Sequence, residues 1–211
     1  MIFANRQSAA RELAKRLAPY RGQKPLVLAI PRGAVPMAKI IAEALDGEFD
    51  VVLVRKLGAP RNPEFAIGAI DESGRTYISP HARATGADEA WIESVKQKEL
   101  DTIRRRRAQY SPLHPPIDPK DRIVIVLDDG LATGSTMIAA LQALRTRLPQ
   151  KLVCAVPVAP PDTLVKVAGM ADEVVCLYAT ENFHAVGQFY AQFGQVEDDE
   201  VIRLLSGRGS G

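Results

Sequence analysis

The chain has 211 residues, which is enough for one medium-sized domain with a complete hydrophobic core. Its 27 Lys and Arg residues nearly balance 25 Asp and Glu residues, so the net charge of +2 provides no global basic field for binding nucleic acid. The sequence has no apolar run near the roughly 20 residues that span a bilayer, and its start lacks the apolar core of a signal peptide.

These properties indicate a cytoplasmic protein with no membrane partner, and they disfavour a nucleic-acid partner. Cys154 and Cys176 lie in separate apolar runs without the spacing of metal ligands. We therefore expect both cysteines to be buried, reduced thiols.

Predicted strands and helices alternate along the chain. The expected helices cover residues 3–17, 35–45, 87–108, 162–168 and 198–205, and a further helix begins at residue 135. The expected strands cover residues 26–30, 50–54, 123–127, 151–158 and 173–178, and residues 66–70 and 76–79 form a hairpin. Such alternation predicts βαβ units and a parallel sheet, and therefore an α/β fold.

The most informative stretch is residues 122–136, R-I-V-I-V-L-D-D-G-L-A-T-G-S-T. Its apolar run, Ile123 to Leu127, is typical of a strand buried on both faces. An acidic pair, Asp128 and Asp129, follows directly. A loop of glycine and hydroxyl residues then leads into a helix that starts at Ser135. The order is strand, acidic pair, small-residue loop and helix.

This loop predicts an anion site. The amides and hydroxyls of residues 133–136 gather at a helix start, where the helix dipole favours negative charge. The acidic pair suits ligand hydroxyls or a divalent cation, one sugar ring away from the phosphate. The alternative is that Asp128 and Asp129 cap the helix and Gly130 is a turn residue. Two carboxylates, three hydroxyls and two glycines together favour the ligand site, and neither G-x-x-x-x-G-K-[ST] nor G-x-G-x-x-G occurs in the sequence.

V-L-D-D-G-L-A-T-G-S-T resembles the phosphoribosyl-diphosphate (PRPP) motif of type I phosphoribosyltransferases, and most of the chain resembles the small stand-alone bacterial members of that family. The resemblance implies a central, mostly parallel twisted sheet flanked by helices. It also implies that Asp128 and Asp129 hold the ribose hydroxyls and Mg²⁺. The 5-phosphate would be wrapped by Ala132, Thr133, Gly134, Ser135 and Thr136, here called the phosphate loop.

A second loop, Pro31-Arg32-Gly33-Ala34, joins the strand at 26–30 to the next helix, and by itself it would be an ordinary turn. In the resembled family the equivalent loop binds pyrophosphate, here through Arg32 and Gly33. It often carries a non-proline cis peptide, which would fall at Pro31–Arg32. We call residues 31–34 the pyrophosphate loop.

Arg55 and Lys56 follow the strand expected at 50–54, at the sheet edge where ligands bind in open α/β sheets. They could face the diphosphate leaving group, although a solvated surface lysine is the alternative for Lys56. Residues 58–68 resemble the family's mobile lid, with Arg61 as a candidate ligand contact.

The resemblance also implies a domain plan: one domain over residues 1–206 with a helical insertion and Pro-rich connector at about 80–120. A hood with the C-terminal helix would cover about 179–206, followed by a flexible tail at 207–211. Phe183 is the candidate for stacking on an acceptor ring, although packing is the default for such aromatics. The basic run at 104–107 is expected to be a solvated helix face, with a polyanion or subunit contact as the alternative. Apolar residues on the long helix would fit a homodimer.

The implied function is transfer of 5-phosphoribosyl from PRPP to a nitrogen acceptor, a nucleobase or related amine, with release of pyrophosphate. Asp128, Asp129 and Lys56 would be the catalytic residues, and Mg²⁺, Arg32 and Lys56 would neutralise the leaving group. Ala132 replaces the Asp of the hypoxanthine-guanine enzymes, which disfavours a 6-oxopurine. The alternatives are a PRPP-binding regulator with a nucleic-acid or protein partner, and hydrolysis or pyrophosphorolysis of a modified nucleotide.

Overall fold

The computed structural model describes residues 2–110 and 115–207. Its larger sheet is entirely parallel, in the order β2-β1-β6-β7-β8. The strands are β1 (Leu26–Ala29), β2 (Glu48–Val51), β6 (Ile123–Leu127), β7 (Lys151–Ala159) and β8 (Glu173–Ala179). The predicted α/β fold with a central parallel sheet is therefore confirmed.

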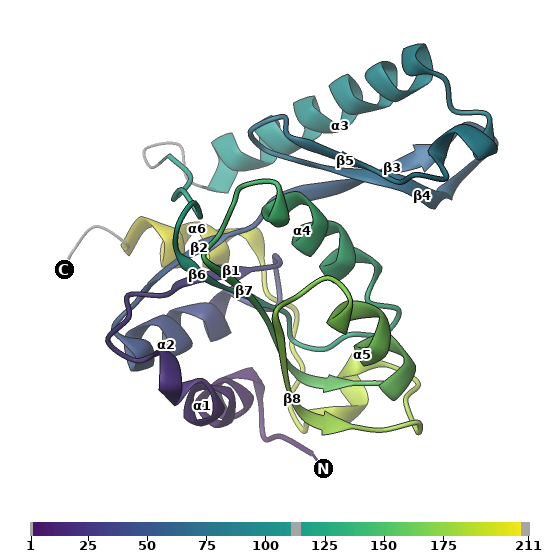
Figure 1. Cartoon of the computed structure of the whole chain (residues 1–211). Coiled ribbons are helices and arrows are strands. Elements are labelled where there is room, and N and C mark those ends of the chain that lie inside the picture. Colours follow the sequence, from purple (N-terminus) through teal and green to yellow (C-terminus); the bar gives the residue numbers. More distant parts are fainter. Residues whose placement is uncertain (1, 111–114, 208–211) are drawn as a thin grey trace.

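Helices cover both faces of this sheet. α1 (Arg6–Arg16) and α2 (Val35–Leu45) lie on one face, and α4 (Ser135–Arg145) and α5 (Pro161–Ala168) lie on the other (Figure 1). Along β1, Val27 packs on the first side and Leu28 on the second. This alternation explains why the strands are apolar at every position, since each face has its own core.

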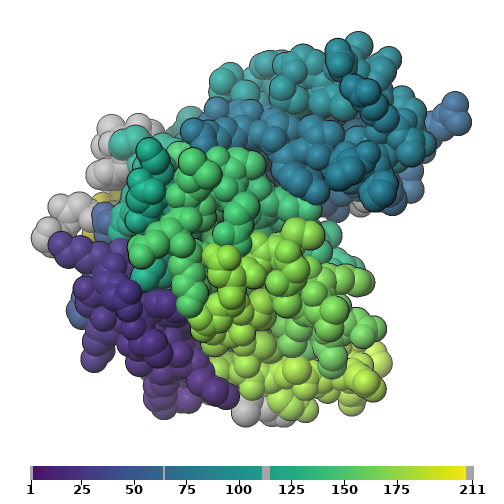
Figure 2. All heavy atoms as spheres, viewed as in Figure 1, coloured from purple at the N-terminus to yellow at the C-terminus, as the bar shows by residue number. Residues whose placement is uncertain are grey.

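A second sheet lies apart from the first. β3 (Val54–Ala59), β4 (Asn62–Asp71) and β5 (Thr76–Ile78) are antiparallel neighbours in that order. The 3₁₀ helix η2 (Ala82–Thr85) follows, and α3 (Glu89–Tyr110) then runs back along the sheet. Together these elements form a lobe that projects from the main body (Figures 1 and 2).

The lobe corrects the bounds of one predicted strand. The strand expected at 50–54 exists but has other bounds, because β2 (Glu48–Val51) ends at Val51 and Val54 already belongs to β3. The residues between them, Val52 and Leu53, are buried outside both sheets, so the apolar run does not show where the chain changes sheet. Residues 58–68, which resemble the family's lid, lie in the hairpin of β3 and β4, and their role as a lid stays a prediction. The hairpin expected at 66–70 and 76–79 is confirmed as β4 and β5.

A buried ion-pair network joins the lobe to the main body. The guanidinium of Arg107, on α3, lies 3.0 Å from Asp50 Oδ1 and 2.6 Å from Glu72 Oε2. The exposed fraction of the Asp50 side chain is only 1%. The expectation of a solvated basic run therefore holds for residues 104–106, which are exposed, and is wrong for Arg107.

Residues near the start of the chain pair with the predicted hood. The amide of Phe3 donates to Phe189 O (2.7 Å), and the amide of Ala191 donates to Phe3 O (2.8 Å). Phe3 and Tyr190 form a parallel bridge, with ring centroids 5.6 Å apart. α1 therefore begins beside the segment that follows the last strand.

The remaining elements are the 3₁₀ helices η1 (Ala18–Tyr20) and η3 (Val186–Phe189) and the helix α6 (Asp198–Ser206), which packs against α2 and α3. Of the tail expected at 207–211, all but Gly207 lies outside the described residues, as do residues 111–114 of the Pro-rich connector. None of the helices in the described ranges is both long and apolar enough to cross a bilayer.

Candidate active site

The two predicted ligand loops meet at the carboxyl edge of the parallel sheet. They follow β1 and β6, which are direct neighbours, with Ala29 paired to Leu127. A Cβ added at Gly33 would lie 2.1 Å from Asp129 Oδ2. The pyrophosphate loop is therefore so close to the acidic pair that only glycine fits at position 33. The cis peptide expected at Pro31–Arg32 is present.

The acidic pair is partly buried. Asp128 Oδ1 accepts a hydrogen bond from the Asp129 amide at 2.9 Å. Burial raises the pKa of the Asp128 carboxyl well above its usual value of 3.8, and the charge of Asp129 raises this pKa further, while Arg6 opposes both effects. The pair is therefore under electrostatic strain that a cation or hydroxyl donors would relieve.

Asp129 is held by residues from both ends of the chain. Arg6 Nε lies 2.8 Å from Asp129 Oδ2, and the side chains are 13% and 14% exposed. The Tyr190 hydroxyl donates to the main-chain oxygen of Asp129 at 2.6 Å. Burial raises the pKa of Tyr190 above its usual value, so this phenol stays protonated and able to donate.

Neither Arg6 nor Tyr190 was among the predicted site residues. Arg6 lies 123 residues before Asp129 in the sequence and Tyr190 lies 61 after it. No short-range pattern links such positions, and an arginine at the first residue of an amphipathic helix has the pattern of a solvated side chain.

The phosphate loop has the expected form. Gly134 is the N-cap of α4 with φ +73°, and the first amide of the helix, that of Ser135, donates to Thr133 Oγ1 at 3.4 Å rather than to Asp128 or Asp129. The alternative that the acidic pair caps α4 is therefore wrong. Gly134 is buried, while Ala132, Thr133 and Thr136 are exposed and Ser135 is half-buried. The loop thus presents a helix start at which, among the described residues, only the Ser135 amide has a side-chain acceptor.

Thr163, from α5, contacts the phosphate loop through both its hydroxyl and its methyl group. Its side chain is buried, and its hydroxyl donates to Ala132 O at 2.7 Å. Its methyl group also lies 2.7 Å from the position that a Cβ on Gly134 would take. A threonine on a neighbouring helix is a second contact that the loop's own sequence could not predict.

The predicted cations line two adjoining cavities. Arg55 and Lys56 lie within β3, and both line a cavity of about 540 Å³ together with Trp91 and Thr136. A second cavity of about 290 Å³ is lined by Arg55, Thr136 and Pro31 of the pyrophosphate loop. Arg55 of β3 therefore lines the same cavity as residues from both ligand loops.

The arginines of this region have acidic partners in the structure. Arg55 Nε lies 2.6 Å from Glu99 Oε2. Arg32 Nη1 lies 3.5 Å from Glu197 Oε2 and 3.8 Å from Asp198 Oδ1, so it points towards the start of α6. A ligand anion would have to compete with these carboxylates for both guanidinium groups.

Phe183 lies in an aromatic cluster. Its ring centroid is 5.2 Å from that of Phe189, and Tyr178 packs on the same ring at 6.0 Å. Phe183 is half-buried against the core on the α1 side of the sheet. Stacking on an acceptor ring stays a prediction.

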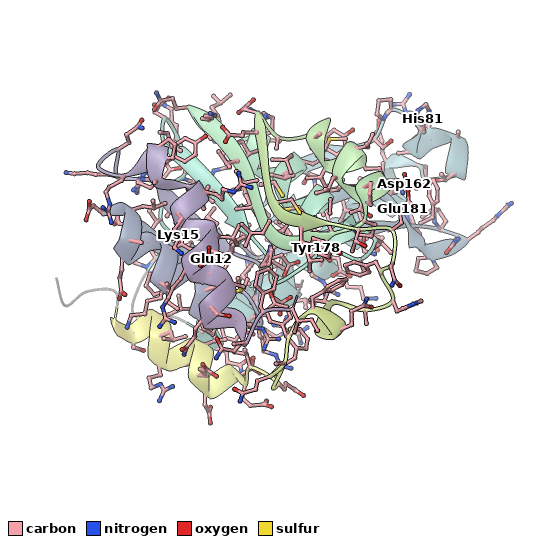
Figure 3. The ribbon with its side chains drawn as sticks, turned by 90° about the horizontal axis from the view of Figure 1, so that it is seen from below. Glu12, Lys15, His81, Asp162, Tyr178 and Glu181 are labelled. Atoms are coloured by element: carbon pink, nitrogen blue, oxygen red, sulfur yellow. The ribbon has the colours of Figure 1, made fainter. Side chains whose placement is uncertain are left out.

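Figure 3 shows His81 on the opposite side of the molecule from α1, where Glu12 and Lys15 form an ion pair.

The chain is similar to known proteins in sequence and in fold. The family model for the phosphoribosyl transferase domain matches residues 1–193. Rv0571c of Mycobacterium tuberculosis, provisionally designated a phosphoribosyl transferase, is 43% identical over 205 residues, covering 97% of this chain and 46% of that protein. The uracil phosphoribosyltransferase of Natronomonas pharaonis is 35% identical over 137 residues, covering 63% of this chain and 55% of that protein. The chain thus spans about half the length of the curated relatives it matches.

A solved structure matches the whole chain. The crystal structure of TT1426 from Thermus thermophilus has a TM-score of 0.93 and 42% identity, and the match covers 99% of each chain. Together with the acidic pair and the phosphate loop, the match over residues 1–193 shows that the chain belongs to the phosphoribosyl transferase domain family.

Proposed function

We propose that the chain transfers the 5-phosphoribosyl group of PRPP to a nitrogen acceptor, a nucleobase or related amine, and releases pyrophosphate. The observation that carries this proposal is the contact between Gly33 and Asp129. It brings a loop for the diphosphate, a pair of carboxylates for the ribose and a helix start for the 5-phosphate to one edge of one sheet.

In the proposed reaction, the bond between the anomeric carbon and the diphosphate oxygen breaks, and a bond from that carbon to the acceptor nitrogen forms. The nitrogen gives up its proton to water or to the departing pyrophosphate. Positive charge develops on the sugar as the diphosphate leaves. Asp128 and Asp129 would orient the ribose hydroxyls, and Arg32 and Lys56 would stabilise the departing negative charge.

Mg²⁺ fits this acidic pair as a proposed cofactor. Magnesium is usually held by one or two carboxylates, with substrate phosphates and water completing its shell. In residues 2–110 and 115–207 no group of three or more acidic, His or Cys side chains could hold a metal, so the donor would have to supply ligands. Bound there, the ion would neutralise charge on the diphosphate.

The acceptor class is open to a direct test. Ala132 and the strand residues Val153 to Val158 offer neither the aspartate nor the lysine that the resembled 6-oxopurine enzymes use. The relative from Natronomonas pharaonis is a uracil phosphoribosyltransferase. Pyrimidines and simple amines therefore come first among the acceptors to be tried. The comparisons give no support to the alternative of a regulator without transfer.

The deciding experiment is a pyrophosphate-release assay with PRPP, Mg²⁺ and a panel of nucleobases and amines. We expect release with at least one acceptor, and we expect Asp129→Asn to abolish most of it. Glu12→Gln is the matched control, because Glu12 is an exposed carboxylate on α1. Absence of both PRPP binding and pyrophosphate release in the unmodified protein would contradict the proposal.

A further inference from the structure

We propose that Arg6 is a positioning residue for Asp129, and that it ties the ribose-binding carboxylate to the hood. This inference rests on the proposed function, because it assigns Arg6 a role in binding PRPP. Arg6 belongs to α1, outside the strands and loops that form the phosphoribosyltransferase motif.

The contact itself is a strong one. Arg6 Nε lies 2.8 Å from Asp129 Oδ2, and both side chains are largely buried. A charge-assisted hydrogen bond of this length fixes the carboxylate more firmly than a neutral one would. It also leaves Asp129 Oδ1 without a hydrogen-bond donor among the described residues. Arg6 thus occupies one oxygen of the carboxylate and leaves the other for a ribose hydroxyl.

Arg6 is in turn held by the hood. Its Nη1 donates to Gly194 O at 2.6 Å, and its guanidinium carbon lies 3.8 Å from the centroid of the Phe193 ring. Three contacts therefore fix the plane of one guanidinium: a carboxylate, a carbonyl and an aromatic face. Lysine could satisfy only part of this set.

A second contact joins the hood to the same residue. Tyr190, which stacks on Phe193 at 4.9 Å, donates its hydroxyl to Asp129 O. The side chain of Asp129 is thus held through Arg6 and its main chain through Tyr190. Both supports depend on residues 190–194, because Tyr190 contacts Asp129 and the other residues of this segment hold Arg6. A displacement of this segment would therefore move Asp129 in the proposed PRPP site.

The position of Arg6 also indicates how it would affect PRPP binding. A Cβ on Gly33 would lie 3.3 Å from Arg6 Nε, so the guanidinium fills the corner between the pyrophosphate loop and Asp129. Its Nε and Nη1 groups already donate to protein oxygens in this corner. We therefore infer that Arg6 acts through Asp129 rather than through the diphosphate.

The test is calorimetric binding of PRPP with Mg²⁺ to the full chain and four variants. Arg6→Gln should weaken PRPP binding by roughly 10-fold or more, the effect typical of a residue that orients a ligand-binding side chain. Arg6→Lys should restore part of the loss. Arg11→Gln, an exposed arginine on the same helix, should bind like the unmodified protein. Phe193→Leu, which keeps the ion pair but removes the ring, should cause a smaller loss of the same kind.

A double-mutant cycle separates positioning from direct contact. In an Asp129→Asn background, Arg6→Gln should change PRPP affinity by no more than about twofold, since the two residues act as one unit. In the otherwise unmodified protein, Arg6→Gln should likewise change the affinity for pyrophosphate alone by no more than about twofold. A full Arg6 effect in the Asp129→Asn background would overturn the positioning role.

The outcomes also separate this inference from the proposed function. If the unmodified protein does not bind PRPP, the proposed function fails and the inference fails with it. If it binds PRPP and a folded Arg6→Gln variant binds equally well, only the inference fails. If Arg6→Gln does not fold, Arg6→Lys takes its place in this test. A PRPP affinity of Arg6→Lys equal to that of the unmodified protein would then contradict the inference and leave the proposed function standing.

Discussion

Gly33 and Asp129 lie in such close contact that a single methyl group could not fit between them: a Cβ at residue 33 would fall 2.1 Å from Asp129 Oδ2 and 2.9 Å from its Cγ. The carboxylate cannot easily retreat, because Arg6 holds it. The two loops are therefore fitted to each other across neighbouring strands.

Gly33→Ala should disturb both loops. Forcing a methyl group into a packed contact costs about 1–3 kcal/mol of the free energy of unfolding. We expect a lower melting temperature and a loss of most PRPP affinity, measured by thermal denaturation and calorimetry. Gly169→Ala is the control, because φ is −70° there and the nearest atom to a new Cβ is 3.6 Å away. Normal PRPP binding by Gly33→Ala would show that the contact is not required.

Asp128→Asn should stabilise the protein at neutral pH while weakening PRPP binding. A carboxyl whose pKa is raised on folding contributes stability below its unfolded pKa, and this contribution is lost as the pH rises through the folded pKa. The ionised Asp128 is therefore a cost at neutral pH, which asparagine removes. Melting temperatures measured from pH 4 upward should diverge, with the variant gaining over the unmodified protein as the pH rises. A constant difference across this range would contradict the assignment.

Thr163→Val should loosen the phosphate loop without changing its shape. Valine keeps the methyl group beside Gly134 but removes the hydrogen bond to Ala132 O, at a cost of about 0.5–1.5 kcal/mol. We expect weaker binding of ribose 5-phosphate, measured by calorimetry. Thr163→Ser keeps the hydroxyl and should retain more affinity than valine does. The reverse order would rule out the hydrogen bond as the cause.

Arg107→Ala should destabilise the junction between the lobe and the main body. Removing one partner from a buried ion pair costs about 3–5 kcal/mol, because the remaining charges stay desolvated. The affected carboxylates are Asp50 and Glu72. Arg105→Ala, at an exposed position two residues earlier, should change the free energy of unfolding by less than about 0.5 kcal/mol. Urea denaturation of both variants measures the difference, and equal stabilities would contradict the role of the network.

The parallel sheet and the ligand loops could be predicted because their signals are local. The apolar run at 123–127, the acidic pair and the small-residue loop are contiguous, and each follows from the chemistry of its own residues. β6 and α2 have the predicted bounds, and α4 begins at the predicted Ser135. The pyrophosphate loop required the family resemblance, since its sequence alone fits an ordinary turn.

The second sheet and the supports of Asp129 could not be predicted in this way. The apolar residues from Val51 to Val54 are continuous, so their pattern does not reveal that the chain leaves one sheet and enters another. Arg6, Tyr190 and Thr163 reach the site only through tertiary packing. Arg107 has the same sequence context as three exposed arginines and differs from them only in what its helix face meets.

The pairing of Phe3 with Tyr190 has a consequence for how the protein is made. The ribosome makes Arg6 before Asp129, and Tyr190 and Gly194 after it, yet all four meet at one point. The acidic pair therefore emerges before its hood partners have been translated. Its final geometry is set only when residues 190–194 pack against the segment that carries Arg6.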